Sequence, residues 1–284
     1  MKITRREFHF VTVGAMAGLR RSPLAAVQRY KGVTFGTQSY SFRDRSIDEM
    51  IDGMRQIGLM NVELWQGHIE PKNVSRDEMR KWRETVSLDE FTKIKEKFDR
   101  GGITITAYNI SFKDDFSDME IERGFEMTKA LGSKVITASA NTRVVTRVAP
   151  VAARHKIPVA MHNHSRIAPN EFATPDDFIT AMKASPFIAT NLDIGHYTAA
   201  NFDAVAFLQQ HHDRILSLHI KDRKRNDGPN VPFGEGDTPI GAVLRLLRDR
   251  GWAIPANIEY EYNGGDTVQE VRRCLEYCRR QLDS

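Results

Sequence analysis

The sequence predicts a single α/β domain, a (β/α)8 TIM barrel, on three observations. Eight short β-rich runs alternate with longer amphipathic segments along the 284 residues. No linker rich in Pro, Gly or Ser interrupts this alternation, so one domain accounts for residues 31–284. Several amphipathic segments begin with a helix-capping sequence shortly after a β-rich run, which is typical of repeated βα units with parallel strands.

The predicted strands are short and spread along the whole domain. They are residues 33–39, 60–65, 103–109, 134–139, 158–163, 189–194, 215–220 and 256–260. Eight such units in about 250 residues match a closed barrel, whereas a doubly wound open sheet usually has fewer strands and a glycine-rich first turn. No G-x-G-x-x-G pattern follows the first strand, so the sequence gives little support for dinucleotide binding.

Capping boxes predict where five of the helices begin. In this motif a Ser or Thr side chain accepts a hydrogen bond from the backbone amide three residues later. The acidic side chain of that later residue accepts in turn from the backbone amide of the Ser or Thr. The pairs that fit are Ser46 with Glu49, Ser87 with Glu90, Ser117 with Glu120, Thr174 with Asp177, and Thr267 with Glu270.

The first thirty residues have the parts of an export signal. Arg5 and Arg6 stand just before Phe8, and a modest apolar run covers residues 10–19. The segment resembles a twin-arginine (Tat) signal, which implies the Tat export machinery as a partner and a periplasmic location. Ten apolar residues span only about half of a bilayer core, so we expect no permanent membrane span. The alternative is an ordinary basic first helix on a cytoplasmic protein.

Charge and cysteine content narrow the function classes. The formal net charge is +4, but residues 32–284 hold 34 basic and 36 acidic groups, so we expect no nucleic-acid partner for the barrel. With 40% apolar and 27% charged residues, the chain is not intrinsically disordered. Cys274 and Cys278 are one helical turn apart and are interpreted as packing residues.

Titratable residues gather where the predicted strands end. In a barrel of this type, chemistry is expected at the C-terminal ends of strands. Burying an imidazole or a carboxylate there is costly unless it is paired or bound to a cation. Mixed imidazole and carboxylate ligands suit Mn²⁺, Co²⁺, Zn²⁺ or Fe²⁺ rather than Ca²⁺. The residues concerned are Glu63, Tyr108, Asn109, His162, Asn163, His164, Asp193, His196, His219, Lys221, Asp222, Glu259 and Glu261.

Three of these strand ends resemble the last three strands of the xylose isomerase-like superfamily, the sugar-phosphate isomerase/epimerase group. The segments are Leu192-Asp193-Ile194-Gly195-His196, Leu218-His219-Ile220-Lys221-Asp222 and Ile258-Glu259-Tyr260, with Gly234-Glu235-Gly236-Asp237 similar to the family's G-x-G-x-[ID] segment. The resemblance implies one divalent metal ion, held by an acidic residue of the fifth strand and by Asp193, His219 and Glu259.

The fifth strand departs from the family pattern, because His162 stands where a Glu is usual. An imidazole can still ligate, so His162 or, with the same strand parity, His164 is the expected fourth ligand. The resemblance also implies a pair of Glu residues that exchange a proton on opposite faces of the substrate, and one of them is missing here. Glu259 and His162 are therefore the expected bases, or His164 if His162 is committed to the metal.

The chemistry implied is proton removal next to a sugar carbonyl, through an enediolate. Reprotonation gives isomerisation or epimerisation, and loss of a β-substituent gives elimination, as in dehydratases and keto-glycoside lyases of the superfamily. His196 is expected to contact a hydroxyl or act as an acid, and Lys221 to face an oxyanion. The expected substrate contacts are Glu63, Trp65, Asn109, Tyr197 and Glu261. No glycine-rich phosphate cradle ends the last two strands apart from Gly264-Gly265, which favours a non-phosphorylated sugar or keto-sugar.

Two rival functions stay open. One is an apurinic endonuclease of the related barrel type. A resemblance to that family would imply a three-zinc cluster, which needs more ligands than this chain offers. The other is a catalytically degenerate barrel that only binds sugar, for which the missing fifth-strand Glu is the best support. The outer helices also offer surfaces for a homo-oligomer.

Overall fold

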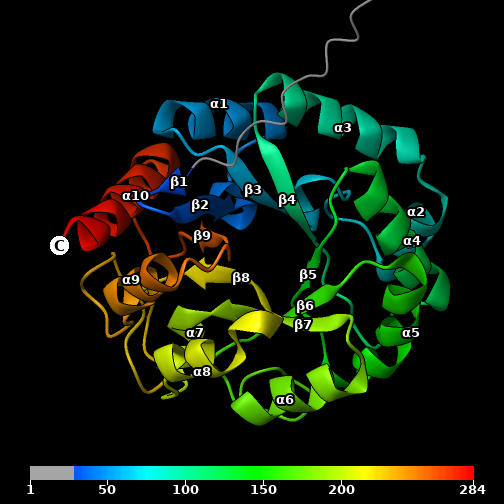
Figure 1. The fold of residues 1–284 in the computed structure, drawn as a ribbon. Helices are drawn as coiled ribbons and strands as arrows, with labels where there is room; N and C mark the ends of the chain where they lie inside the picture. Colours follow the sequence, from blue (N-terminus) through cyan, green and yellow to red (C-terminus); the bar gives the residue numbers. More distant parts are fainter. Residues whose placement is uncertain (1–28) are drawn as a thin grey trace, which may run out of the picture.

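The computed structural model describes residues 29–284, in which eight parallel strands close into a barrel (Figure 1). Each barrel strand pairs with the next, and the first pairs with the last through Phe35 and Ala256. All eight predicted strands are present, so the predicted fold class is confirmed. The strands are β2 (Val33–Gln38), β3 (Asn61–Trp65), β4 (Thr104–Asn109), β5 (Ile136–Ala138), β6 (Val159–His162), β7 (Ile188–Asp193), β8 (Ile215–Ile220) and β9 (Ala256–Ile258).

Helices form a ring outside the strands (Figure 1). They are α1 (Ile47–Ile57), α2 (Arg76–Thr85), α3 (Leu88–Arg100), α4 (Asp118–Ala130), α5 (Val145–His155), α6 (Pro175–Ala184), α7 (Ile194–Ala199), α8 (Ala204–His211), α9 (Ile240–Arg250) and α10 (Thr267–Asp283). The last helix, α10, packs beside α1 and α9, which completes the ring. The hydrophobic core lies between the strands and these helices; α1, for example, buries Met50, Met54 and Ile57 at helical spacing.

Three of the five predicted capping boxes are present, at the starts of α1, α4 and α6. The predictions for Ser87 and Thr267 are wrong. Ser87 caps α3, but it accepts from the Asp89 amide and forms no box. Asp266 rather than Thr267 caps α10, because its carboxylate already accepts from the Gln269 amide. Glu270 is thereby free to accept from the Tyr262 hydroxyl.

A further capping box, between Ser75 and Glu78, begins α2. The sequence analysis missed it because α2 follows the 3-10 turn Gln66–His68 and an irregular segment rather than a strand. The same helix carries Arg83, which is buried in an ion-pair network with Glu70 and Glu120.

The predicted export signal falls largely on residues 1–28, which lie outside the described residues. Its last two residues, Arg29 and Tyr30, form strand β1 (Arg29–Tyr30), which pairs antiparallel with β2. The Tyr30 hydroxyl donates to Asp283 Oδ1 at 2.8 Å, so these two residues are part of the folded domain. None of the helices between residues 29 and 284 combines the length and hydrophobicity that a membrane-spanning helix needs.

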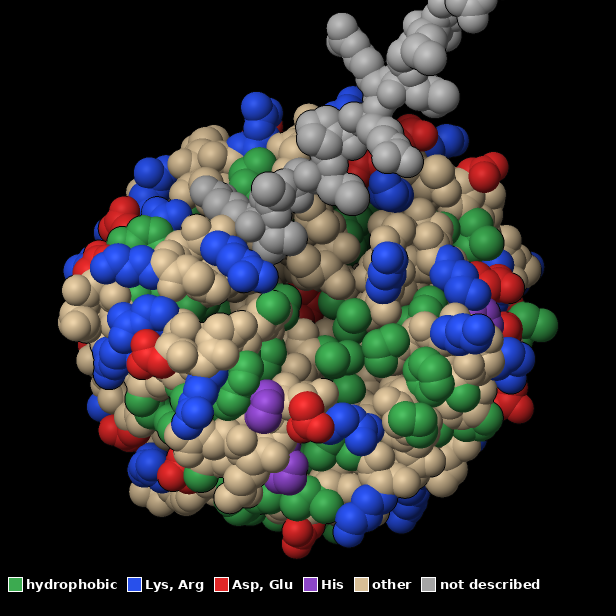
Figure 2. All heavy atoms as spheres, in the orientation of Figure 1, with side chains coloured by type: hydrophobic (Ala, Val, Ile, Leu, Met, Phe, Trp, Pro, Cys, Tyr) green, Lys and Arg blue, Asp and Glu red, His purple; other side chains and the backbone are tan. Residues whose placement is uncertain are grey.

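On the face of the molecule in Figure 2, Lys and Arg side chains are scattered around the rim and interspersed with Asp and Glu. Among the described residues, surface ion pairs include Arg147 with Asp118 and Lys97 with Asp48.

Candidate metal centre

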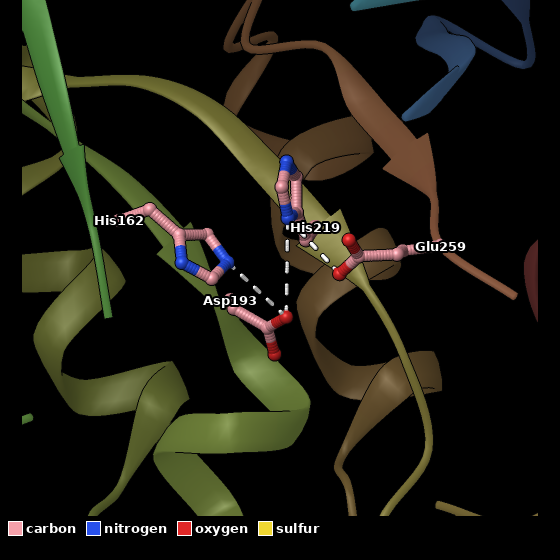
Figure 3. Close-up of side chains that lie close together, drawn as sticks. All are labelled: His162, Asp193, His219 and Glu259. Atoms are coloured by element: carbon pink, nitrogen blue, oxygen red, sulfur yellow. Dashed lines mark ion pairs between the residues drawn. The ribbon is translucent and has the colours of Figure 1, made fainter. Parts of the chain in front are cut away.

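Four side chains converge at the C-terminal end of the barrel (Figure 3). They are His162 at the end of β6, Asp193 at the end of β7, His219 on β8 and Glu259 directly after β9. One possible ligand atom from each lies within 4.8 Å of the others, and all four residues are buried. Such a group of imidazole nitrogens and carboxylate oxygens can bind a metal ion.

Strand register explains why these side chains meet. Asp193 and His219 are direct partners in the β7–β8 ladder. His219 pairs with Asn257 on β9, and Glu259 follows Asn257 by two residues. His162 pairs with Asn191, which precedes Asp193 by two residues. Because residues two apart on a strand point to the same face, all four side chains point into the barrel.

The atoms that face the centre form no hydrogen bond among the described residues. Asp193 Oδ2 is 3.5 Å from His162 Nε2 and 3.9 Å from His219 Nδ1, and Glu259 Oε2 is 3.2 Å from His219 Nδ1. All of these atoms are buried without a hydrogen bond. Buried polar atoms nearly always form hydrogen bonds, so this shared lack of hydrogen bonds fits a cation at the centre.

In two of the four side chains, the polar atom that faces away from the centre is hydrogen-bonded to another residue. Asp193 Oδ1 accepts from the His196 amide at 2.6 Å, which leaves Oδ2 turned to the centre. His219 Nε2 donates to Glu63 Oε1 at 2.9 Å, which leaves Nδ1 turned to it. Ligand histidines commonly donate their second ring N–H in this way.

Charges inside the centre shift the pKa values of its members strongly. Burial alone would lower the pKa of His219, but the Glu63 and Glu259 carboxylates raise it well above its ordinary value. Burial alone would raise the pKa of Asp193, but the Lys221 ammonium holds it well below its usual range. Burial alone would also raise the pKa of Glu259, but Lys221 and His219 lower it. The two carboxylates of the cluster are therefore already ionised and ready to ligate near neutral pH.

Glu63 lies beneath the centre and is fully buried. Its Oε1 accepts from Thr137 Oγ1 at 2.7 Å and from Gln38 Nε2 at 2.9 Å, in addition to His219. Its Oε2 accepts from Ser217 Oγ at 3.0 Å. Glu63 does not line the cavity described below, so its interpretation as a substrate contact is not supported by its position.

A cavity of about 350 Å³ opens above the four side chains. Among the predicted site residues, Trp65, Asn109, His164, His196, Lys221 and Glu261 line it together with His162, His219 and Glu259. The sequence analysis missed four other lining residues, namely Gln38, Tyr40, Ser111 and Ser139. Gln38 ends strand β2, so the strand-end criterion used for the other residues would have found it.

Tyr197 does not line this cavity, so its position does not support its prediction as a substrate contact. Its ring is 1% exposed and packs against Phe202 and Phe207 in the core. The reason is the helical phase of α7, in which successive side chains are about 100° apart. With His196 facing the cavity, Tyr197 faces the hydrophobic core.

Lys221 is buried beside the centre among three carboxylates. Its Nζ is 2.7 Å from Glu261 Oε2, 2.8 Å from Glu259 Oε2 and 3.2 Å from Asp193 Oδ2. Burial alone would lower the pKa of Lys221, but these carboxylates raise it. The ammonium group is therefore charged and fully paired within the described residues.

His164 lies outside the four-residue cluster but on the cavity wall. Its Nε2 is in hydrogen-bond contact with Ser139 Oγ at 3.0 Å, and its Nδ1 is 3.8 Å from Glu171 Oε2. Burial, followed by the charges of His162 and Lys113, lowers the pKa of His164 to about 3. Of the two histidines proposed for the fifth-strand position, the structure thus brings His162 into the cluster.

The Gly234-Glu235-Gly236-Asp237 segment surrounds the carboxylate of Asp222. Asp222 Oδ2 accepts from the amides of Gly234 and Gly236 at 2.7 and 3.0 Å. A Cβ atom at Gly236 would lie 1.9 Å from Asp222 Oδ1, so only glycine allows this close approach. The segment thereby fixes the position of Asp222, which directly follows Lys221 in the sequence.

Comparison with known proteins places these features in a family. A profile described as "Xylose isomerase-like TIM barrel" matches residues 51–280. L-ribulose-5-phosphate 3-epimerase UlaE of Escherichia coli is 28% identical over 99 residues, which are 34% of this chain and 35% of that protein. The chain thus spans about a third of the length of the curated relatives it matches.

Two solved structures share the fold over nearly their whole length. The 3-keto-D-glucoside 4-epimerase YcjR from E. coli has a TM-score of 0.66 and 17% identity, covering 87% of this chain and 99% of that one. The IOLI protein with a bound zinc atom has a TM-score of 0.65 and 15% identity, covering 87% and 98%. At these identities the likeness shows the fold alone.

Proposed function

The chain belongs to the xylose isomerase-like TIM barrel family, and we propose that it is a divalent-metal-dependent sugar isomerase or epimerase that removes a proton next to a sugar carbonyl. The observation that carries this proposal is the convergence, under an open cavity, of four buried ligand atoms that form no hydrogen bond. The similarity to UlaE and to YcjR, both named as sugar epimerases, supports the substrate class.

The residues that would hold the ion are His162, Asp193, His219 and Glu259. They form the single group of this kind found in residues 29–284, which supports one ion rather than the three-zinc cluster of an apurinic endonuclease. Two imidazoles and two carboxylates suit Mn²⁺, Co²⁺, Zn²⁺ or Fe²⁺. Bound there, such an ion would polarise a substrate oxygen and acidify the neighbouring C–H bond.

Proton transfer falls to side chains that line the cavity. His162 cannot both ligate through its facing Nε2 and accept a proton there. His164 stands two residues further along, lines the cavity and is held at Nε2 by Ser139. We assign the two bases to Glu259 and His164, with His164 replacing the carboxylate that is missing from the fifth strand. The Lys221 ammonium lies beside Glu259 and would face negative charge that develops on a substrate oxygen.

The substrate we propose carries no phosphate. Among the described residues that line the cavity, Lys221 is the one lysine or arginine, and its assignment to the oxygen next to the labile proton leaves no second cation for a phosphate. The Gly264-Gly265 pair offers no spare cradle, since the Gly265 amide donates to Glu270 Oε1 at 3.2 Å. Trp65, Asn109 and Glu261 are the residues placed to contact a sugar or keto-sugar.

The test is hydrogen exchange from solvent. Free sugars and 3-keto-glycosides are incubated in D₂O with the protein and added Mn²⁺ or Co²⁺, and deuterium next to the carbonyl is measured by NMR. We expect incorporation that depends on the metal and is lost in Asp193→Asn. Metal uptake without exchange in any substrate would instead favour a sugar-binding barrel.

A second candidate is a keto-glycoside lyase or dehydratase, in which the same proton removal is followed by loss of a β-substituent. The observation that favours it is that His162 stands where a Glu is usual in the family. Elimination needs a single base, whereas epimerisation through two opposed carboxylates needs two. Product analysis separates the two reactions, since elimination creates an unsaturated ketone that absorbs in the ultraviolet.

The proposed location is the periplasm. It depends on Arg5 and Arg6 of the Tat-like segment within residues 1–30, with the barrel in residues 31–284. Cell fractionation of the full chain and of a variant with both arginines changed to lysine tests it. Equal amounts of both in the cytoplasm would support the basic-helix alternative.

A further inference from the structure

Arg223 is a buried residue, 8% exposed, and its guanidinium lies behind His196. Its Nε and Nη2 donate to the Gly228 carbonyl oxygen at 3.0 and 2.6 Å, and Nη2 is also 3.5 Å from Asp227 Oδ1. Its Nη1 donates to Ser165 Oγ at 2.7 Å. The remaining Nη1 hydrogen faces His196 Nδ1, 2.6 Å away.

His196 is therefore placed between two groups that can only donate. Lys221 Nζ is 3.1 Å from the other ring nitrogen, Nε2. A neutral imidazole has one donor and one acceptor nitrogen, so it cannot accept from Arg223 and Lys221 at the same time. An imidazolium could accept from neither.

The charges around the two donors decide which contact is the hydrogen bond. Lys221 Nζ has carboxylate oxygens of Asp193, Glu259 and Glu261 within 3.2 Å, so its charge is compensated without His196. Without His196, by contrast, the second Nη1 hydrogen of Arg223 would be buried with no acceptor among the described residues. Leaving a buried charged donor unpaired is costly, so His196 Nδ1 accepts from Arg223 and the ring proton is on Nε2.

We propose that Arg223 is a positioning residue that holds His196 in the Nε2–H tautomer, so that His196 acts on the cavity as a hydrogen-bond donor and not as a base. The Nε2–H group then faces the cavity beside the positive charge of Lys221. A donor in this position suits a substrate oxygen that carries or develops negative charge. The functional meaning of this arrangement rests on the proposed function.

The guanidinium is itself held by three segments, which explains how it keeps this geometry. Ser165 belongs to the loop after β6, His196 to α7, and Gly228 to the loop after β8. Ser165 Oγ also donates to Asp227 Oδ1 at 2.5 Å, and the Asp227 amide donates to the Ala199 carbonyl oxygen at 2.8 Å. Arg223 therefore has a single position in which all its donors are used.

The experiment is NMR of the metal-free and the zinc-loaded protein with ¹⁵N-labelled histidine, because protonated and unprotonated ring nitrogens have well separated ¹⁵N shifts. The His196 signals are assigned by their loss in His196→Asn. We expect an unprotonated Nδ1 and a protonated Nε2 across the neutral pH range. In Arg223→Met this fixed pattern should be replaced by averaged shifts or by the Nδ1–H form.

Two further variants keep the test decisive. Arg223→Lys retains a donor near His196 and should partly retain the tautomer, whereas Ser165→Ala removes the other Nη1 partner and should retain it fully. A wild-type Nδ1–H signal, or unchanged His196 shifts in Arg223→Met, would overturn the proposal, and the wild-type spectrum decides even if Arg223→Met fails to fold. This NMR measurement uses no substrate, so it is independent of the deuterium-exchange test. If the expected tautomer is found but no substrate exchanges deuterium, the proposed enzymatic function is refuted and the proposal for Arg223 stands.

Discussion

His219 and Glu63 form a buried pair in which the imidazole Nε2 donates to the carboxylate at 2.9 Å and Nδ1 is left facing Asp193 and Glu259. Glu63 thereby fixes both the ring orientation and the tautomer that a metal ion needs. The arrangement of carboxylate, histidine and metal ligand site also raises the basicity of the ligand nitrogen.

Glu63→Gln is expected to weaken metal binding by about 10–100-fold, because a neutral amide still accepts from His219 but no longer supplies a charge. Affinity is measured by competition with a chromogenic chelator. The matched control is Glu270→Gln, another buried glutamate that accepts several hydrogen bonds but lies on α10 away from the centre. Equal affinities in Glu63→Gln and wild type would show that the contact does not act on the metal site.

Metal binding is expected to release about one proton per ion near neutral pH. In the metal-free protein burial would lower the pKa of His219, but Glu63 and Glu259 raise it above its ordinary value, so both ring nitrogens carry protons. The ion must displace the Nδ1 proton, and affinity should therefore rise with pH until the raised pKa is passed. Asp193 and Glu259 add little, because their pKa values are lowered and both are already ionised.

Calorimetry in two buffers of different ionisation enthalpy measures this proton release. Glu63→Gln serves as the comparison, since loss of the carboxylate lowers the His219 pKa and should reduce the number of protons released. A binding enthalpy that does not depend on the buffer would contradict the assignment of His219 as a ligand.

Substitutions of the two fifth-strand histidines are expected to separate metal binding from proton transfer. His162→Gln should reduce metal affinity, because Nε2 of His162 is 3.5 Å from Asp193 Oδ2 within the cluster. His164→Gln should leave affinity unchanged and lower deuterium exchange by about 10²–10⁴-fold, the usual contribution of a general base. Chelator competition and D₂O exchange on the same preparations give the comparison. The roles are reversed if His164→Gln loses the metal.

The sequence predicted the barrel because strand ends and helix caps are local signals, and parallel strands bring their C-terminal ends to one rim. Asp193, His219 and Glu259 were found by that reasoning together with the family resemblance. Glu63 shows a limit of this reasoning. Alternation along β3 predicts which face of the strand a side chain is on, but not how deep in the barrel it lies, because that depends on the other seven strands. Tyr197 and Arg223 show a second limit, because tertiary packing sets the helical phase of α7 and the path of the loop after β8.

Gly236→Ala is expected to destabilise the protein by about 1–3 kcal/mol, the usual cost of an added carbon in a filled space. The new Cβ would lie 1.9 Å from Asp222 Oδ1, and Asp222 cannot retreat without losing the bonds from the Gly234 and Gly236 amides. Urea denaturation followed by circular dichroism measures the loss. Gly265→Ala is the control, because its Cβ would meet only Glu270 Oε1 at 3.5 Å, an ordinary contact. If both variants unfold at the wild-type urea concentration, the Gly234-Glu235-Gly236-Asp237 segment does not hold Asp222 rigidly as described above.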